Sequence, residues 1–270
     1  MTDKRYKIGV MCICLNEPYW QYAKDMIESA NKHLLKEHDV EFLFWSDMPK
    51  ESSYGATVFP TEAVTWPYPT LLRYHLFLKE EEYLRKFDYL FYVDIDMLFV
   101  GTVGSEILGE HLTMTQHPMY ALRPGLYPPF EPNLNSTAYI PRLGRHIHQN
   151  GQLRLEPLYA AGGFQGGTTD SFIKAMRSMK RTIDDDFTKN YAAIWNDESH
   201  WNKYLFDNPS TVSVVLDPSY CYPDSLIKEY YIPIWGRDYS PKLVTITKKF
   251  SLSKEGGEAV SQVIGDFKKI

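Results

Sequence analysis

The feature that most constrains the fold of this chain is an almost continuous apolar run from Tyr89 to Phe99, which contains Asp94 and Asp96. The sequence reads Tyr-Leu-Phe-Tyr-Val before the first aspartate and Met-Leu-Phe after the second. Such a run predicts a buried strand that carries two carboxylates at its far end. Because uncompensated carboxylates are costly in a low-dielectric site, we expect a bound cation or a dense set of hydrogen-bond donors beside them.

Asp94 and Asp96 suit a hard divalent cation. Residues two apart on a strand point to the same face, so both carboxylates are expected to converge on one ion at the carboxyl end of the sheet. Open α/β sheets bind their ligands at that edge. Asp-x-Asp alone is a common pattern, and a structural ion pair is the alternative, but the apolar flanks favour metal-diphosphate binding.

Length and charge narrow the class of protein. The chain has 270 residues and is 44% hydrophobic, which suits one α/β domain with a sizeable core. There are 29 basic and 34 acidic residues, and the net charge is −5. We therefore expect no nucleic acid among the partners.

The cysteines Cys12, Cys14 and Cys221 are odd in number and lack the paired spacing of zinc sites. This pattern indicates a reducing compartment, and Cys12 and Cys14 are expected to be packed thiols. The N-terminus does not resemble a signal peptide, and no apolar run approaches the roughly 20 residues of a transmembrane segment. We therefore expect a cytoplasmic protein with no transmembrane segment.

Strands and helices alternate along the chain, which predicts a mixed, mostly parallel sheet flanked by helices in a single α/β domain. The expected strands are 6–15, 41–45, 89–99, 112–116 and 212–216. The expected helices are 19–35, 71–87, 169–179 and one that starts near Asp197, a competent N-cap. Residues 118–157 form a long segment of little periodicity, which is typical of a functional segment. The clustered glycines of 162–167 indicate a close backbone approach to a ligand or a flexible turn.

Five motifs follow one another along the chain: Tyr92-Val93-Asp94-Ile95-Asp96-Met97, Gln116-His117-Pro118, Ser136-Thr137-Ala138-Tyr139-Ile140-Pro141, Gly162-Gly163-Phe164-Gln165-Gly166-Gly167 and Trp195 to Leu205. Together they resemble glycosyltransferase family 6, which holds the histo-blood-group A and B transferases, α-1,3-galactosyltransferase and soluble bacterial relatives. The resemblance extends from Ile8 to about Lys249. It implies a GT-A catalytic domain at 1–250, with a nucleotide-binding half at about 1–105 and an acceptor half at about 106–250, and a C-terminal tail at 251–270.

The resemblance also implies a reaction. Galactose or N-acetylgalactosamine would move from a UDP donor, in α-1,3 linkage and with retention of configuration, to an oligosaccharide or glycolipid that ends in a β-galactoside. Mn²⁺ would be the cofactor, with Asp94 and Asp96 as its ligands. Two alternatives are a binding protein of the same fold with weak or lost turnover and a sugar-1-phosphate nucleotidyltransferase. The latter would need a Gly-rich basic signature, which the segment from Ile8 to Tyr19 lacks.

The family's site positions carry over residue by residue. Donor binding would fall to Ile13, Cys14, Leu15, Tyr19, Arg73, Asp94, Ile95, Asp96, Ala161, Gly162, Gly163, Asp197 and Lys248. The acceptor would contact His117, Trp195 and Glu198. Glu198 is also the catalytic candidate, as a nucleophile or as a stabiliser of positive charge at the sugar; its alternative is a first-turn glutamate favoured by the helix dipole. Lys248 or the neighbouring Lys249 would close over the phosphates, and a solvated chain end is the alternative.

Donor choice is expected to depend on the small residues Ala161 and Gly163. They would leave space beside the sugar C2 for an acetamido group, which favours UDP-N-acetylgalactosamine over UDP-galactose. Enlarging Gly163 to Ala is therefore expected to shift the preference toward galactose. Asn196 and Trp201 depart from the family pattern, which bears on acceptor specificity.

Overall fold

The computed structural model describes residues 4–49, 53–121, 128–141, 158–224 and 240–246. Its centre is a seven-stranded sheet in the order β3-β2-β1-β4-β7-β6-β8. The strands are β1 (Lys7–Cys14), β2 (Asp39–Ser46), β3 (Thr57–Pro60), β4 (Tyr89–Val93), β6 (Leu112–Gln116), β7 (Ala160–Thr168) and β8 (Val212–Leu216). Of these strands β7 alone is antiparallel to its neighbours. The prediction of a mixed, mostly parallel sheet is therefore confirmed.

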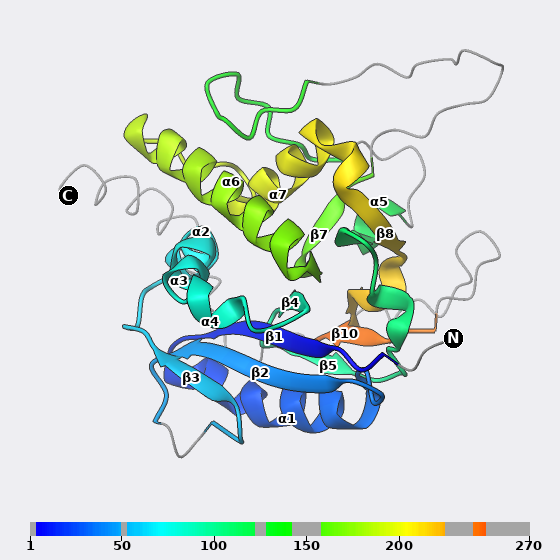
Figure 1. Ribbon diagram of the computed structural model, residues 1–270. Helices are drawn as coiled ribbons and strands as arrows, with labels where there is room; N and C mark the ends of the chain where they lie inside the picture. Colours follow the sequence, from blue (N-terminus) through cyan, green and yellow to red (C-terminus); the bar gives the residue numbers. More distant parts are fainter. Residues whose placement is uncertain (1–3, 50–52, 122–127, 142–157, 225–239, 247–270) are drawn as a thin grey trace, which may run out of the picture.

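Helices and a second, small sheet cover the two faces (Figure 1). On one face lie α1 (Glu17–His33) and a three-stranded sheet in the order β5-β10-β9, formed by β5 (Met97–Phe99), β10 (Leu243–Thr245) and β9 (Tyr222–Pro223). The other face packs against α3 (Arg73–Lys79), α4 (Glu81–Leu84), α6 (Thr169–Thr188) and α7 (Asn196–Asp207). The short α2 (Tyr68–Leu71) precedes α3, and α5 (Pro118–Ala121) follows β6.

Strand β1 shows why its residues suit the sheet centre. Its side chains alternate between the two faces: Cys12 and Cys14 join the core under α1, whereas Met11 and Ile13 join the core under α3 and α6. A strand buried on both faces needs a nearly continuous apolar run, which this segment supplies. Cys12 and Cys14 are free, buried thiols, as expected.

The segment from Tyr89 to Phe99 is not one strand, and this part of the prediction is wrong. β4 ends at Val93, and the amide of Met97 donates to the carbonyl of Asp94 at 3.1 Å, which closes a turn. Met97 then begins β5, which pairs with β10 in the small sheet. Asp94 and Asp96 therefore lie in a turn between two sheets. Residues on both sides of the turn are buried, so the apolar pattern does not reveal the break.

Three other predicted elements differ from the structure. The expected helix over 71–87 is divided into short helices, with α3 ending at Lys79 and α4 beginning at Glu81. Helix α6 continues past its expected end to Thr188, because its buried face continues through Ile183. Asp197 is not the N-cap of α7: Trp195 holds that position and Asp197 lies in the first turn.

The glycines of 162–167 belong to β7 and form neither a loop nor a turn. A Cβ at Gly166 would lie 2.3 Å from the carbonyl oxygen of Leu90 on β4. Gly167 has a φ of 144°, and a Cβ there would lie 2.2 Å from the carbonyl oxygen of His111. These two glycines therefore serve the close packing of β7 against its neighbours, as glycine does where backbones approach closely.

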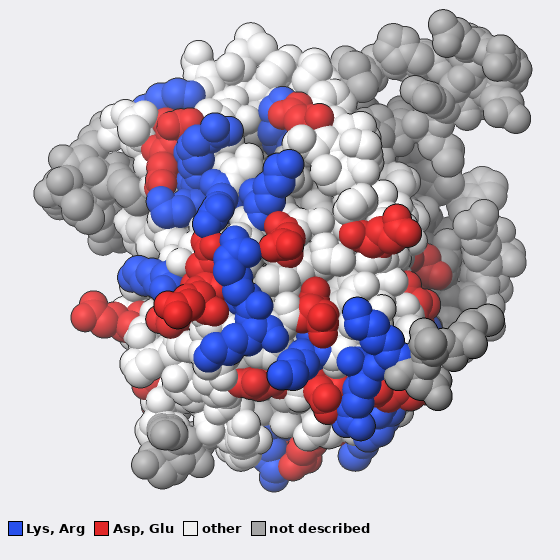
Figure 2. Space-filling model, in the orientation of Figure 1, with Lys and Arg blue, Asp and Glu red and all other residues white. Residues whose placement is uncertain are grey.

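Positive and negative side chains are interspersed over the face of the molecule shown in Figure 2. Ion pairs join some of the elements, as where Arg177 of α6 meets Glu81 of α4 at 2.7 Å. The face in view is therefore mixed in charge. Among the described helices, none is at once long and apolar enough to cross a membrane.

Candidate active site

Three carboxylates from two elements meet at the beginning of β7. Asp94 directly follows β4, and its backbone amide donates to the carbonyl of Gly163 at 2.9 Å. Asp197 and Glu198 lie in the first turn of α7. Glu198 Oε2 accepts a hydrogen bond from the amide of Gly162 at 2.7 Å. Because β7 is antiparallel to β4, its first residues lie at the carboxyl edge of β4, where these side chains converge.

Arg73, the first residue of α3, is the buried cation of this cluster. Its Nε lies 3.2 Å from Asp197 Oδ2, and one terminal nitrogen lies 3.9 Å from Asp94 Oδ1. The guanidinium also donates to the carbonyl of Gly162 at 3.3 Å. Burial disfavours the charge, but Asp197 and then Tyr92 and Asp94 outweigh it, so the pKa of Arg73 lies above its ordinary value. Arg73 therefore holds α3, β7 and α7 together as a permanent cation.

Tyr92 and Gly163 set the orientation of the Asp94 carboxylate. The Tyr92 hydroxyl donates to Asp94 Oδ1, and the face of its ring lies 4.0 Å below the guanidinium of Arg73. A Cβ at Gly163 would lie 2.9 Å from Asp94 Oδ2. Glycine thus leaves a space beside the second oxygen, and the Asp94 side chain is 37% exposed. The carboxylate is held on one side and accessible on the other.

The cluster carries more negative charge than Arg73 neutralises. Burial raises the pKa of Asp197 to about 7; Arg73 opposes this rise, and the charge of Asp94 adds to it. Burial also raises the pKa of Glu198 to about 7, against hydrogen bonds from Tyr159 and Gly162. Deprotonated carboxylates in such a site are stabilised by an added cation.

Asp94 and Asp96 fit a divalent cation in the chemistry of their oxygens and in the charge of their surroundings. Asp96 is buried in the same turn, where its carbonyl accepts from the amide of Ile246 at 2.9 Å. Among the described residues, His, Cys, Asp and Glu side chains do not gather in threes into a metal site. The remaining ligands of an ion here would therefore come from substrate or water, as is usual for Mg²⁺-like ions bound with phosphates.

Glu198 is fixed from both oxygens and from its backbone. The Tyr159 hydroxyl donates to Oε1 at 2.8 Å, while Gly162 occupies Oε2. Asn202, one helical turn later, donates to the carbonyls of Glu198 and Ala160, each at 2.9 Å, and accepts from the amide of Ala160 at 2.8 Å. The carboxylate is therefore tied to β7, and this exceeds what a helix-dipole role requires.

His117 contacts Tyr159, which donates to Glu198, and Trp195 lies three residues before Glu198 at the start of α7. His117 packs its ring against Tyr159, with centroids 5.7 Å apart, and its amide donates to the Tyr159 carbonyl at 2.9 Å. Burial lowers the pKa of His117 to about 4, and its Nδ1 accepts from the amide of Met119 at 3.2 Å. Trp195 is 46% exposed at the start of α7, and its amide donates to Ser199 Oγ at 3.1 Å. His117 is thus a neutral, partly buried ring, and Trp195 offers an exposed one.

The other predicted positions are more dispersed. The side chains of Ile13, Cys14 and Leu15 are buried at the carboxyl end of β1, so a ligand there would meet backbone rather than side chains. The Ser46 hydroxyl donates to the carbonyl of Cys14. Tyr19 packs in part against the core beneath α1.

Ile95 is buried in the Asp94–Asp96 turn, and Ala161 is buried in β7. Lys248, Lys249 and the predicted tail 251–270 lie outside the described residues. The binding roles assigned to these residues stay predictions.

Four residues in or beside the cluster have no site role in the sequence-based prediction: Tyr92, Tyr159, Asn202 and Cys221. Asn202 stands four residues after Glu198, a spacing that places both on one helix face and offers a weak signal. The thiol of Cys221 has a pKa that burial raises to about 12, with the charges of Asp94 and Glu198 adding to the rise. It is therefore a protonated neighbour of the cluster.

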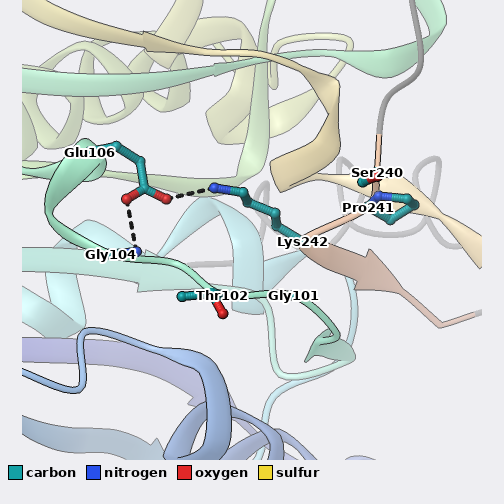
Figure 3. A pocket seen from close by; sticks show the side chains of 7 residues that line it. All are labelled: Gly101, Thr102, Gly104, Glu106, Ser240, Pro241 and Lys242. Atoms are coloured by element: carbon teal, nitrogen blue, oxygen red, sulfur yellow. Dashed lines mark hydrogen bonds and ion pairs between the residues drawn. The ribbon is translucent and has the colours of Figure 1, made fainter.

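Figure 3 shows a separate pocket of about 570 Å³. Its lining begins at Gly101, after the last residue of β5, whereas Asp94 and Asp96 precede the first. Its charged groups already interact: Lys242 contacts Glu106 at 2.7 Å, and Glu106 accepts from the amide of Gly104 at 2.9 Å. Lys242 also donates to the Tyr220 hydroxyl at 2.8 Å. These contacts join the residue before β10 to the segment after β5, so the charged groups of this pocket have a structural role.

Residues 1–233 match the model of a known family, Glycosyltransferase family 6. The match covers most of the chain and includes the turn after β4, the first residues of β7 and the first turn of α7. The chain belongs to glycosyltransferase family 6.

Curated relatives are identical to this chain at between a quarter and a third of the aligned residues. The rat histo-blood group ABO system transferase 1 is 29% identical over 231 residues, which are 82% of this chain and 62% of the rat protein. The chicken globoside alpha-1,3-N-acetylgalactosaminyltransferase 1 is 27% identical over 228 residues, 80% of this chain and 62% of the relative. The Escherichia coli O-antigen biosynthesis glycosyltransferase WbnI is 27% identical over 221 residues, 80% of this chain and 88% of the relative. The chain thus spans less than two thirds of the two animal proteins.

Proposed function

We propose that this chain is a retaining glycosyltransferase of the GT-A fold. It transfers N-acetylgalactosamine or galactose from a UDP donor to a terminal β-galactoside in α-1,3 linkage. The observation that carries the proposal is the convergence of Asp94, Asp197 and Glu198 at the beginning of β7, where Arg73 is the one buried cation that the described residues supply. Membership of family 6 and the α-1,3 linkage in a relative's name support it.

Asp94 and Asp96 hold Mn²⁺ in this proposal. The ion, when bound, supplies positive charge to the departing diphosphate. Tyr92 keeps one oxygen of Asp94 engaged, and the other faces the space that Gly163 leaves. Arg73 limits the repulsion between Asp94 and Asp197, so the donor side of the site is assembled before substrate arrives.

Glu198 acts at the sugar. Its two oxygens are fixed by Tyr159 and Gly162, so the carboxylate keeps one orientation while positive charge develops at the anomeric carbon. A carboxylate so placed serves either as a nucleophile or as an electrostatic stabiliser, and both routes give retention. Asp197 binds donor-sugar hydroxyls, and His117 and Trp195 contact the acceptor.

A donor panel tests this function. UDP-N-acetylgalactosamine, UDP-galactose, UDP-glucose and UDP-N-acetylglucosamine are each offered with lactose, once with Mn²⁺ and once with EDTA. We expect metal-dependent transfer from one or both galacto-configured donors, with an α-1,3 linkage by NMR. Transfer that is equal in EDTA would refute the metal, and a β-linked product would refute retention.

A further inference from the structure

Glu131 is a buried carboxylate outside the catalytic cluster, with 1% of its surface exposed. Its Oε1 accepts from the amide of Asn133 and from the Tyr191 hydroxyl, each at 2.8 Å. Its Oε2 accepts from the amide of Ile194 at 2.7 Å. All three donors are neutral groups. A buried anion is retained at a cost in desolvation, so its position calls for a reason beyond stability.

The donors of Glu131 come from two distant segments. Asn133 belongs to the same segment as Glu131, whereas Tyr191 and Ile194 precede α7. Ile194 and the adjacent Trp195 are 52% and 46% exposed, so this loop presents two large apolar side chains to solvent. The loop is therefore tied by Glu131 on one side and, through the amide of Trp195, by Ser199 on the other.

Phe130, the residue before Glu131, packs against Tyr159, which holds the Glu198 carboxylate. Its ring lies 5.3 Å from that of Tyr159, whose hydroxyl donates to Glu198. Phe130, Ile140 and Tyr159 form a small buried cluster. Two consecutive residues thus support two parts of the site: Phe130 supports Tyr159, and Glu131 holds the loop that carries Trp195.

We propose that Glu131 is a positioning residue for the acceptor, which fixes Ile194 and Trp195 as a rigid apolar platform beside Glu198. This inference rests on the proposed function, because it assigns a determinant of acceptor binding within the same site. Rigid aromatic and aliphatic side chains suit the apolar face of a sugar ring, and prior ordering of the loop lowers the entropy lost on binding.

Glu131→Gln is the informative change because it keeps the shape of the side chain. One acceptor oxygen becomes an NH₂ group, which faces either the Ile194 amide or the pair formed by Asn133 and Tyr191. Two donors then oppose each other and one contact is lost. Glu41→Gln is the matched control: Glu41 also accepts from a tyrosine hydroxyl, that of Tyr83 at 2.7 Å, but it lies on β2.

Steady-state kinetics measure KM for lactose, KM for the donor and the rate of donor hydrolysis without acceptor. Loss of a hydrogen bond to a charged group is worth about a factor of ten, so Glu131→Gln should raise KM for lactose about tenfold. Donor KM and hydrolysis should stay within about twofold, because the cluster around Arg73 is unchanged. Equal loss in transfer and hydrolysis, or an unchanged KM for lactose, would overturn the proposal.

Hydrogen exchange provides a readout that does not depend on catalysis. The peptide that contains Ile194 should exchange faster in Glu131→Ala and at the wild-type rate in Glu41→Ala, because alanine removes both acceptor oxygens and the Ile194 amide then loses its acceptor. Unchanged exchange in Glu131→Ala would refute the positioning role whatever the enzyme transfers. A wild-type protein that neither transfers nor hydrolyses any donor would refute the proposed function, and with it the acceptor part of this inference.

Discussion

The buried carboxylate of Asp186 and the carboxylates at the beginning of β7 are satisfied in opposite ways. Asp186, near the end of α6, accepts from Ser136 Oγ at 2.6 Å and from the amide of Thr137 at 2.7 Å. Lys189 Nζ lies 3.6 Å from Oδ1, the oxygen that Thr137 contacts, and His200 Nε2 lies 3.8 Å from Oδ2, the oxygen that Ser136 contacts. One carboxylate thus has two hydrogen-bond donors and a cation, all supplied by the protein.

The cluster at the beginning of β7 lacks this balance. Asp94 and Asp197 share the single guanidinium of Arg73, and Glu198 is held by neutral donors. The pKa values of Asp197 and Glu198 rise to about 7, chiefly through burial. The comparison separates a carboxylate that holds segments together from carboxylates that await a ligand of opposite charge.

The largest expected effect comes from removing a carboxylate of the turn. Asp96→Asn should nearly abolish transfer, by about a thousandfold, because the proposed metal loses an anionic ligand while the shape of the side chain is kept. Initial rates at saturating Mn²⁺ measure it. Asp170→Asn, in a side chain that is 90% exposed, is the control. Full activity of Asp96→Asn in EDTA would contradict the metal assignment.

Glu198→Gln should retain donor binding and lose at least about a hundredfold in kcat, since a charge that stabilises the transition state is removed without a change of shape. Binding of the UDP donor by calorimetry and single-turnover rates separate the two steps. Glu106→Gln, in the pocket of Figure 3, controls for loss of a carboxylate elsewhere. An unchanged kcat with a raised donor KM would make Glu198 a binding or capping residue.

Gly163→Ala distinguishes the effect expected from the sequence from the effect expected from the structure. The sequence predicts a change in donor preference toward galactose. In the structure, the added Cβ would lie 2.9 Å from Asp94 Oδ2, so the carboxylate must move. We expect kcat/KM to fall about tenfold for both donors, as a small misplacement of a catalytic group commonly costs that or more. The sequence interpretation would be favoured if the ratio of kcat/KM for the two donors changed while kcat/KM for the better donor stayed at its wild-type value.

Ser136→Ala tests the hydrogen bonds that hold the buried carboxylate of Asp186. The substitution takes one donor from the buried Asp186, which should cost about 1–3 kcal/mol of stability. Urea unfolding measures the loss. Activity per folded molecule should stay near that of the wild type, because the cluster at β7 does not contain Asp186. A loss of kcat without a loss of stability would show that Asp186 and the cluster at β7 are coupled.

The last expected effect is on the pH dependence of stability. The pKa of Glu198 rises on folding from 4.5 to about 7, so its contribution to stability is lost as pH rises through this window. The pKa of His200 falls from 6.5 to about 4, and its contribution is lost as pH falls from 6.5. In the metal-free protein, the Tm of Glu198→Gln relative to wild type should therefore rise between pH 5 and pH 8, by about 2–4 °C per kcal/mol of difference. A Tm difference independent of pH would contradict the raised pKa.

The elements that local patterns define were predictable. β1, β2, β6 and β8 lie within a few residues of their expected bounds, as does α1, because alternation, apolar runs and helical spacing are properties of neighbouring residues. β5 was not predictable as a separate strand. It pairs with β10, residues Leu243–Thr245, and nothing within 89–99 signals a partner so far along the chain.

The same distinction applies to the site. Asp94 stands out because a charge next to a buried strand is unusual, whereas Asp197 and Glu198 were assigned to the site through the family resemblance. Tyr159 does not stand out, since its contact with Glu198 depends on β7 and α7 being placed together. Arg73 was noticed only through a resemblance, although it is the cation that joins the carboxylates. Long-range partners are fixed by topology, which a single sequence does not display.

The reversed direction of β7 also governs how such a protein changes over generations. Parallel strands deliver to one sheet edge the residues that follow them, whereas β7 delivers to that edge the residues that precede it. Insertions or deletions before β7 therefore remodel the rim of the site and leave the register of the sheet intact. A change of chain length before β7 can thus alter the rim of the site without moving the carboxylates or Arg73, because other elements carry them.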